Sequence, residues 1–182
     1  MTQALLLVDI QNDYFPGGAM ELVGAPEAAM QAELLLRAFR RAARPVVHIQ
    51  HVATRPGATF FLPGSPGVAF HPRVAPLPGE TVFLKHFPNS FRETPLLEHL
   101  RGLGLTQLVV AGMMTHMCID TTVRAAFDLG FQCLLAGDAC ATRDLARPGV
   151  TVPAAQVQAA FLAALDGTFA KVLAAAELGA GL

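Results

Sequence analysis

The sequence has little net charge and few charged residues. Lys and Arg number 13 against 14 Asp and Glu, a formal net charge of -1, and charged residues make up 15% of the 182. Because there is no run of Lys or Arg, we do not expect nucleic acid or an anionic membrane as the main partner. Hydrophobic residues make up 53%, which excludes a disordered tail or linker. The length suits a single domain, residues 1–182, with a substantial core.

The sequence also lacks long apolar runs and an even set of cysteines. No uninterrupted apolar stretch approaches 18 residues, so we expect no transmembrane helix. The N-terminus has no basic segment and reaches Asp9 after five apolar residues, so we expect no signal peptide. Three cysteines are an odd number in a chain too large to need disulfides. They favour reduced thiols and a cytoplasmic location.

Short apolar runs alternate with longer helical patterns along the chain. This alternation predicts an α/β fold, with a parallel sheet covered by helices on both faces. The predicted strands are Ala4–Val8, Pro45–Ile49, Thr81–Leu84, Leu108–Ala111 and Phe131–Ala136, with Thr168–Leu173 as a sixth strand or a short terminal helix. The predicted helices are Pro26–Ala43, Pro95–Arg101, Cys118–Leu129 and Pro153–Leu165. Sheets of this kind bind ligands beyond the carboxyl ends of their strands.

One segment, Arg55 to Glu80, does not follow this alternation. It contains six Pro and four Gly, with Phe60, Phe61 and Phe70 among them. It is too rich in Pro for regular structure and too apolar for a solvated linker. Long ordered loops of this composition are commonly lids or interface arms, and both interpretations stay open. Its apolar side chains also predict that the protein forms a homodimer or a higher homo-oligomer.

Three residues at predicted strand ends can carry chemistry together. Cys118 stands where a helix should begin, and a thiol ionises more readily at a helix N-terminus or beside a cation. Lys85 follows another strand and can supply that cation. Asp9 follows the first strand and can accept the thiol proton. Taken singly, each has an ordinary interpretation as a core thiol or a solvated charge.

Four motifs make the nucleophile interpretation specific. They are DIQNDY at 9–14, LKHFPNSF at 84–91, GMMTHMCIDTTVRAAFDLG at 112–130 and GDACAT at 137–142. With these motifs the sequence resembles the isochorismatase-like cysteine hydrolase family. The resemblance implies a three-layer α/β/α, Rossmann-like fold with a six-stranded, mainly parallel sheet, and a catalytic triad of Asp9, Lys85 and Cys118. True isochorismatases, which cleave a vinyl ether, lack the cysteine, so Cys118 favours hydrolysis of carbon–nitrogen bonds.

The resemblance implies further details of the site. It implies a cis peptide bond at Met113–Met114, with the backbone N–H groups of Met114 and Cys118 forming an oxyanion hole. It also suggests that Gln11 supports the site and that Asn89 and Phe91 line the substrate pocket. His86 and His116 flank the site and are expected either to line the pocket or to be structural. Tyr14 and Phe15 complete the expected pocket.

No metal or organic cofactor is expected. His48 and His51 lie three residues apart on a predicted strand, so they point to opposite faces. The Asp-x-His metal motif of nicotinamidases is missing from the corresponding segment, IQHVATRPG at 49–57, which also argues against nicotinamide as the substrate. No GxGxxG follows a strand, so a dinucleotide site is not expected. Cys133 is interpreted as a packing residue and Cys140 as inert.

These observations predict a cysteine-dependent hydrolase of a small amide, ureide or carbamoyl compound that works through a thioester intermediate. The partner is then a small-molecule substrate. Two alternatives stay open. One is an isochorismatase-type ether hydrolase, and the other is a catalytically silent oligomeric scaffold of the same fold.

Overall fold

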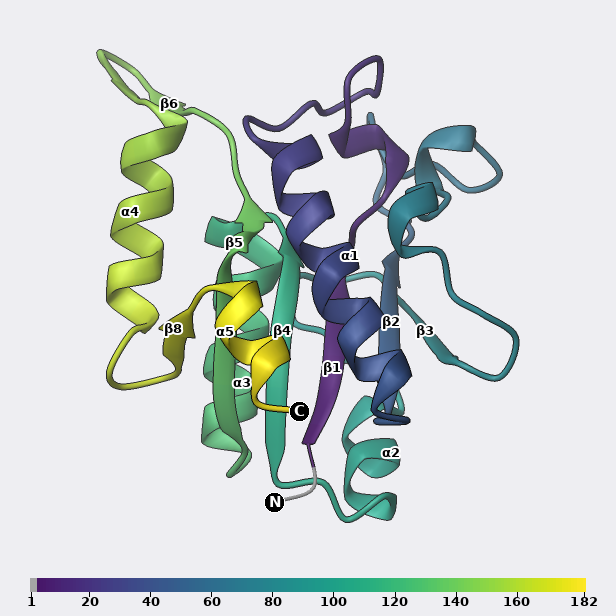
Figure 1. The fold of residues 1–182 in the computed structure, drawn as a ribbon. Helices are drawn as coiled ribbons and strands as arrows, with labels where there is room; N and C mark the ends of the chain where they lie inside the picture. The colour runs from purple at the N-terminus through teal and green to yellow at the C-terminus, as the bar shows by residue number, and fades with distance from the viewer. Residues whose placement is uncertain (1–2) are drawn as a thin grey trace.

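The computed structural model describes residues 3–182. Its centre is a sheet of six parallel strands covered by helices on both faces (Figure 1). The strand order is β3 (Thr81–Lys85), β2 (Val46–His51), β1 (Gln3–Val8), β4 (Gln107–Met113), β5 (Gln132–Ala141) and β8 (Lys171–Leu173). The helices are α1 (Ala25–Arg41), α2 (Leu96–Gly102), α3 (Asp120–Asp128), α4 (Ala154–Leu165) and α5 (Ala175–Ala180). The predicted three-layer α/β/α fold is confirmed.

The central strand β1 is apolar throughout because both of its faces are covered. Leu5 and Leu7 pack with α1 and α5 on one face. Leu6 and Val8 pack on the other face with α2 and α3, through residues such as Leu100. A continuous apolar run is the pattern of a strand buried on both sides. β1 lies between β2 and β4, and its carboxyl end therefore opens at the middle of the sheet.

Several boundaries differ from the sequence-based expectations. The fifth strand continues beyond Ala136 to Ala141, because a register shift between Val110 and Gly112 lets it stay paired with β4. Of the region 168–173 only Lys171–Leu173 forms a strand, β8, and a helix, α5, follows it. A short antiparallel hairpin, β6 (Leu145–Arg147) and β7 (Val150–Val152), was not predicted. Among the described residues no helix is both long and apolar enough to cross a membrane.

The Pro-rich segment, residues 55–80, is folded against the start of the chain. Besides the 3₁₀ turns η2 (Pro66–Val68) and η3 (Pro72–Val74), it pairs Phe70 with Gln11 in an isolated antiparallel bridge. Asp13, in the 3₁₀ turn η1 (Asn12–Tyr14), accepts a 2.6 Å hydrogen bond from the Phe61 backbone N–H. A Cβ on Gly67 would lie 1.9 Å from the Asp13 carboxylate, so only glycine fits there. These contacts pack the segment against η1. Homo-oligomerisation stays a prediction.

Glu80 fastens the end of this segment to the body of the protein. Its carboxylate accepts hydrogen bonds from Arg40 at 2.7 and 2.8 Å and from the Leu77 backbone N–H at 2.8 Å. It also lies 2.9 Å from Nε2 of the buried His48. Burial raises the pKa of Glu80, but these bonds outweigh burial and lower the pKa to about 2.

Replacing Glu80 with glutamine should lower the free energy of unfolding at pH 7 by roughly 1–3 kcal/mol, the usual contribution of hydrogen bonds to a charged group. Because folding lowers the pKa of Glu80 from 4.5 to about 2, its contribution is present above pH 4.5. It should disappear as the pH falls toward 2. Denaturant unfolding of the wild type and Glu80→Gln at several pH values measures this. Glu33→Gln, which removes bonds to the exposed Arg37 and Arg73, is the control and should cost less. Equal losses at pH 7 and pH 3 would contradict the assignment.

Candidate active site

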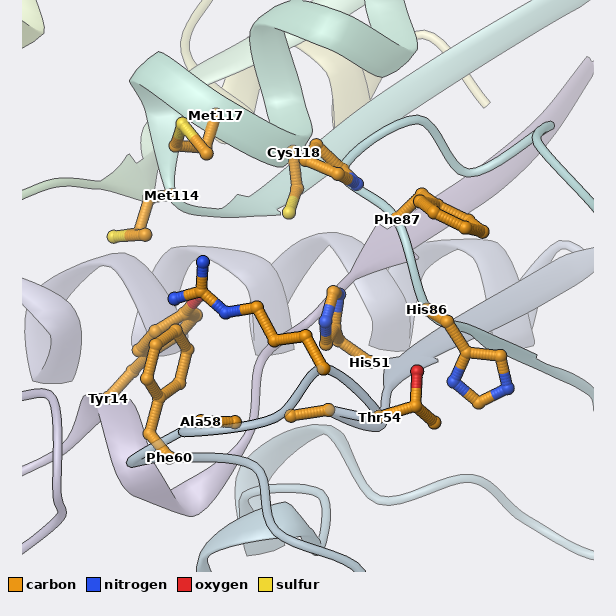
Figure 2. A pocket seen from close by; sticks show the side chains of 13 residues that line it. Tyr14, His51, Thr54, Ala58, Phe60, His86, Phe87, Met114, Met117 and Cys118 are labelled. Carbon is orange, nitrogen blue, oxygen red and sulfur yellow. The ribbon is translucent and has the colours of Figure 1, made fainter.

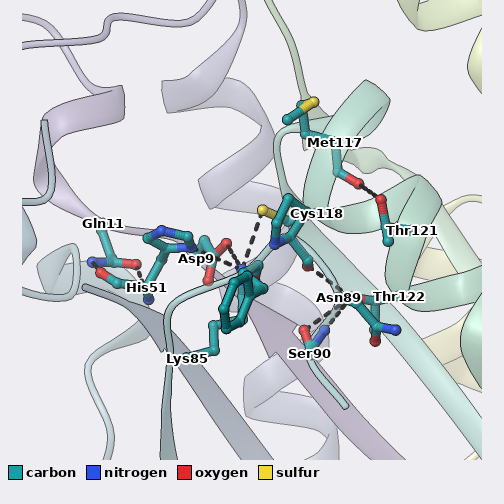
Figure 3. A network of polar contacts seen from close by, with 12 residues as sticks. Asp9, Gln11, His51, Lys85, Asn89, Ser90, Met117, Cys118, Thr121 and Thr122 are labelled. Atoms are coloured by element: carbon teal, nitrogen blue, oxygen red, sulfur yellow. Dashed lines mark hydrogen bonds and ion pairs between the residues drawn. The ribbon is translucent and has the colours of Figure 1, made fainter. Parts of the chain in front are cut away.

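The three predicted catalytic residues meet at the carboxyl edge of the sheet (Figure 3). Asp9 directly follows β1, Lys85 ends β3, and Cys118 lies in a π-helical turn, η4 (Thr115–Ile119), between β4 and α3. Lys85 Nζ lies 2.7 Å from Asp9 Oδ2 and 3.2 Å from Cys118 Sγ. Asp9 and Lys85 are almost completely buried, and Cys118 is 5% exposed. The ammonium thus bridges the carboxylate and the sulfur.

Two unusual backbone conformations lie at the catalytic residues or close to them in sequence. Asp9 has a φ of 53°, a conformation that is uncommon for residues other than glycine and often found at functional sites. The Met113–Met114 peptide bond is cis, as the resemblance implied. The helix that was expected to begin at Cys118 instead begins at Asp120, because the π-helical turn occupies 115–119. Within that turn, the Met114 carbonyl accepts from the N–H groups of Met117 and Ile119.

Ionisation in the site differs from the expectation for an isolated cysteine at a helix start. Burial and the carboxylate of Asp9 raise the pKa of the Cys118 thiol, and Lys85 only partly opposes them. Burial lowers the pKa of Lys85, but Asp9 and Cys118 outweigh it and raise that pKa. The resting site therefore holds a neutral thiol beside a Lys85 ammonium. The expectation of a lowered Cys118 pKa is wrong, because it left out desolvation and the adjacent carboxylate.

The Asp9 carboxylate is well placed to receive the thiol proton. Both of its oxygens are buried, and within residues 3–182 neither accepts a hydrogen bond from a backbone amide or a hydroxyl group. A carboxylate oxygen of Asp9, a ring nitrogen of His51 and Sγ of Cys118 all lie within 4.8 Å of one another. The carboxylate therefore has free lone pairs close to the sulfur.

His51 is a fourth member of this cluster. It ends β2, between the strands that carry Asp9 and Lys85, and its Nδ1 lies 3.2 Å from Lys85 Nζ. Gln11 fixes its backbone on both sides, accepting from the His51 N–H at 2.8 Å and donating to the His51 carbonyl at 2.9 Å. Burial lowers the pKa of His51 to about 4, so the imidazole is neutral near pH 7. His48 faces the other way, toward Glu80, as the strand spacing predicted.

Three residues around the ammonium of Lys85 could also be read as metal ligands. Asp9, His51 and Cys118 have the ligand atoms and the spacing for a small cation. Lys85 Nζ, however, lies within 3.2 Å of a potential ligand atom on each of them. A metal ion would have to displace this buried ammonium, so the geometry favours a cluster built for lysine. The absence of a metal stays a prediction.

A cavity of about 330 Å³ opens over Cys118 (Figure 2). Most of its wall is apolar or aromatic, with polar groups from Tyr14, Thr54, Arg55 and two histidines. Burial raises the pKa of Tyr14 well above its usual value, so its phenol is neutral. The lining residues are Tyr14, His51, Ala53, Thr54, Arg55, Ala58, Phe60, His86, Phe87, Pro88, Met114, Met117 and Cys118.

Of the seven side chains expected at the pocket, the structure places Tyr14 and His86 on the cavity wall. The other five lie outside it. The Gln11 side chain hydrogen-bonds to the backbone of His51, and the Phe15 ring stacks on His71. Asn89 accepts from the Phe91 backbone N–H, while the Phe91 ring stacks on Phe131.

His116 also lies outside the cavity, because its Nδ1 lies 2.6 Å from the Thr142 hydroxyl. Sequence reasoning placed it at the pocket because it is close to Cys118 in the chain. Cys133 and Cys140 are buried in β5 at 6% exposure each and contact backbone carbonyls.

Sequence reasoning missed His51 and the wall contributed by Arg55, Ala58 and Phe60. His51 was available from the same rule that found Asp9 and Lys85, since it closes a parallel strand at the same edge. The wall residues lie in the Pro-rich segment, whose path depends on tertiary contacts such as the Asp13–Phe61 hydrogen bond. No spacing rule predicts such a path.

Comparison with known proteins agrees with the fold. The family model of the isochorismatase domain matches residues 3–177. The isochorismatase family protein YddQ of Bacillus subtilis is 50% identical over 172 residues, covering 94% of this chain and 96% of that protein. A streptothricin hydrolase of Streptomyces noursei is 40% identical over 158 residues, covering 84% of this chain and 61% of that protein.

A solved structure of an isochorismatase-family protein from Oleispira antarctica superimposes with a TM-score of 0.95 at 54% identity, covering 99% of this chain and 97% of that one. The fold and the site thus define a three-layer α/β/α protein with a buried cysteine at the carboxyl edge of a parallel sheet. The chain belongs to the isochorismatase family of hydrolases.

Proposed function

We propose that this protein is a cysteine-dependent hydrolase of a small amide, ureide or carbamoyl compound, with Asp9, Lys85 and Cys118 as its catalytic residues. One observation carries the proposal. A buried ammonium lies 2.7 Å from a carboxylate and 3.2 Å from a thiol, and the thiol lines the cavity. A thiol beside a base that can take its proton and a cation that can stabilise the thiolate has the groups for acyl transfer through a thioester.

The arrangement supports a two-stage reaction. In the first stage Asp9 takes the proton of Cys118 while the sulfur attacks the carbonyl carbon, and Lys85 stabilises the charge on sulfur. The backbone N–H groups of Met114 and Cys118 would hold the oxyanion. Asp9 then passes the proton to the nitrogen that departs. In the second stage Asp9 takes a proton from water, whose oxygen attacks the thioester. The C–S bond breaks, Asp9 returns the proton to the Cys118 sulfur, and the product acid leaves.

The neutral resting thiol fits this sequence of steps. Because the Cys118 pKa is raised by burial and by Asp9, the proton stays on sulfur until a substrate is in place. The carboxyl group of Asp9, which must receive the proton, lies close to the sulfur. The proton can then pass directly from Cys118 to Asp9 without exchange with solvent.

Relatives support the choice of bond. A streptothricin hydrolase and, at 27% identity, the ureidoacrylate amidohydrolase RutB of Stutzerimonas stutzeri are among the similar proteins. An ether hydrolase of the isochorismatase type is the alternative reaction, and a silent scaffold is the alternative of another class. The buried Asp9–Lys85 pair argues against a scaffold, since burying charges is costly and is common at functional sites.

A panel of small amides, ureides and carbamoyl compounds, with a vinyl ether included, tests the proposal. Release of ammonia or amine is measured for the carbon–nitrogen substrates, and loss of the enol ether for the other. We expect turnover of at least one carbon–nitrogen substrate and none of the ether. Ether cleavage without release of amine or ammonia would contradict the proposed reaction, and no turnover of any compound would favour the scaffold.

A further inference from the structure

Lys85 has more acceptors around it than it has protons to donate. Four acceptor atoms lie near Nζ: Asp9 Oδ2 at 2.7 Å, the Phe87 carbonyl at 3.1 Å, and His51 Nδ1 and Cys118 Sγ at 3.2 Å each. An ammonium carries three N–H groups and cannot accept a hydrogen bond. One of the four is therefore without a donor at any moment, and a neutral thiol is the weakest acceptor among them.

We propose that His51 is a positioning residue of this site. Its Nδ1 accepts a hydrogen bond from the third N–H of Lys85 while Cys118 is a thiol. Because Nδ1 is then an acceptor, the proton of the neutral imidazole lies on Nε2. The Nε2–H group can donate a hydrogen bond to the substrate. This proposal rests on the proposed function. When Cys118 gives up its proton, rotation about the Cε–Nζ bond moves one Lys85 N–H from His51 to the thiolate. His51 thereby holds the ammonium in place between turnovers.

The geometry of the histidine supports both halves of this role. Because an ammonium only donates, the Nδ1 that it contacts must carry a lone pair, and the neutral ring then carries its proton on Nε2. Nε2 has no hydrogen-bond partner among residues 3–182 and is not fully buried. The ring itself lines the cavity (Figure 2). A polar acceptor on the substrate can therefore reach this N–H.

His86, the other histidine of the cavity, provides an internal comparison. Its Nδ1 lies 2.8 Å from the Val52 carbonyl, which can only accept, so Nδ1 carries a proton. His86 has no contact with Lys85 that would fix the opposite arrangement. Nδ1 therefore carries a proton in His86 and a lone pair in His51, and of these two rings only that of His51 contacts the ammonium.

Five charged or titratable groups surround His51, and they come from four parts of the fold. They are Asp9 after β1, Lys85 at the end of β3, His86 after β3, Arg55 in the Pro-rich segment and Cys118 in η4. The carboxylate of Asp9 favours an imidazolium, whereas burial and the cations of Lys85 and Arg55 oppose it. The balance keeps His51 neutral, as an acceptor for Lys85 requires.

The protonation of His51 can be measured without a substrate. Long-range ¹H–¹⁵N correlation spectra of the whole protein, with the His51 signals assigned by their loss in His51→Asn, distinguish the two neutral forms and the cation. We expect a neutral ring protonated at Nε2 at pH 7, and a mixture of neutral forms in Lys85→Met. A proton on Nδ1, or an imidazolium at pH 7, would overturn the proposal.

The pH dependence of Cys118 alkylation by iodoacetamide tests the link to Lys85. In His51→Leu the Cys118 sulfur is the only remaining acceptor for the third N–H of Lys85. This hydrogen bond then stabilises the thiolate of Cys118. The alkylation profile should move to lower pH, by on the order of one unit. His51→Asn restores an acceptor and should keep the wild-type profile. His86→Leu is the matched control and should also keep it. An unchanged profile in His51→Leu, or a move to higher pH, would overturn the proposal.

The hydrogen bond that His51 Nε2 is proposed to donate to the substrate is tested separately. The side chain of His51→Asn is shorter, so it can accept from Lys85 but withdraws the donor from the cavity. The KM of His51→Asn for a substrate found in the panel should be several-fold higher than that of the wild type. The pH profile of Cys118 alkylation in this variant should stay that of the wild type. An unchanged KM would overturn the donor role. The spectra and the alkylation experiments use no substrate, so they test the role of His51 independently of the proposed amidase activity. The amidase activity itself is tested with Cys118→Ala.

Discussion

Replacing Cys118 with alanine is expected to lower turnover by about 10³-fold or more, the scale seen when an enzyme loses its nucleophile. The reason is that no other group can form the thioester. Cys133 and Cys140 are buried in β5 and hydrogen-bond to backbone carbonyls. Steady-state assays on a substrate from the panel measure the loss, and thermal unfolding checks that the variant folds.

Cys133→Ala is the matched control for this experiment. It removes a buried thiol of the same size from a strand outside the cavity, so kcat should stay near the wild-type value even if stability falls. Near-normal turnover in Cys118→Ala would show that the cysteine mechanism is wrong and would favour the ether hydrolase.

Replacing Asp9 with asparagine is expected to change turnover and thiol reactivity in opposite directions. Turnover should fall by roughly 10²–10⁴-fold, because the site loses the group that takes and returns the proton. The Cys118 pKa should fall, because the carboxylate that raises it is gone while the ammonium of Lys85 stays. Alkylation of Cys118 at pH 7 should therefore become faster in a nearly inactive enzyme.

Lys85→Met is the counterpart of that variant. It leaves Asp9 beside the thiol without the cation that opposes it, so Cys118 alkylation at pH 7 should become slower, and turnover should fall as well. The two variants share a loss of activity and differ in the sign of the change in reactivity. Slower alkylation in Asp9→Asn would contradict the assignment of Asp9 as the base.

Residues whose position depends on the sheet were predictable from sequence. Asp9 and Lys85 end parallel strands, and the carboxyl ends of such strands share one edge. The order β3-β2-β1-β4 then brings them close to the turn that holds Cys118. Local pattern was sufficient to place these residues at strand ends, because the buried strands leave no freedom of register. Their combination into a catalytic triad rested on the family resemblance.

Other features depend on tertiary contacts that no local pattern contains. The raised Cys118 pKa follows from burial and from a carboxylate more than 100 positions away in the chain. The cavity wall at Arg55 and Phe60 follows from the fixed path of the Pro-rich segment. His116 and Phe91 were misplaced because nearness in sequence to a site motif does not fix the direction of a side chain.

Mass spectrometry of the intact protein during turnover tests the central claim most directly. The enzyme is mixed with a slowly hydrolysed substrate from the panel, quenched in acid within the steady state, and then digested to locate any adduct. The thioester account predicts a mass increase equal to the acyl portion of the substrate, located on Cys118 and absent from Cys118→Ala. Turnover with unmodified Cys118 throughout, or an adduct on Cys133 or Cys140 instead, would contradict it.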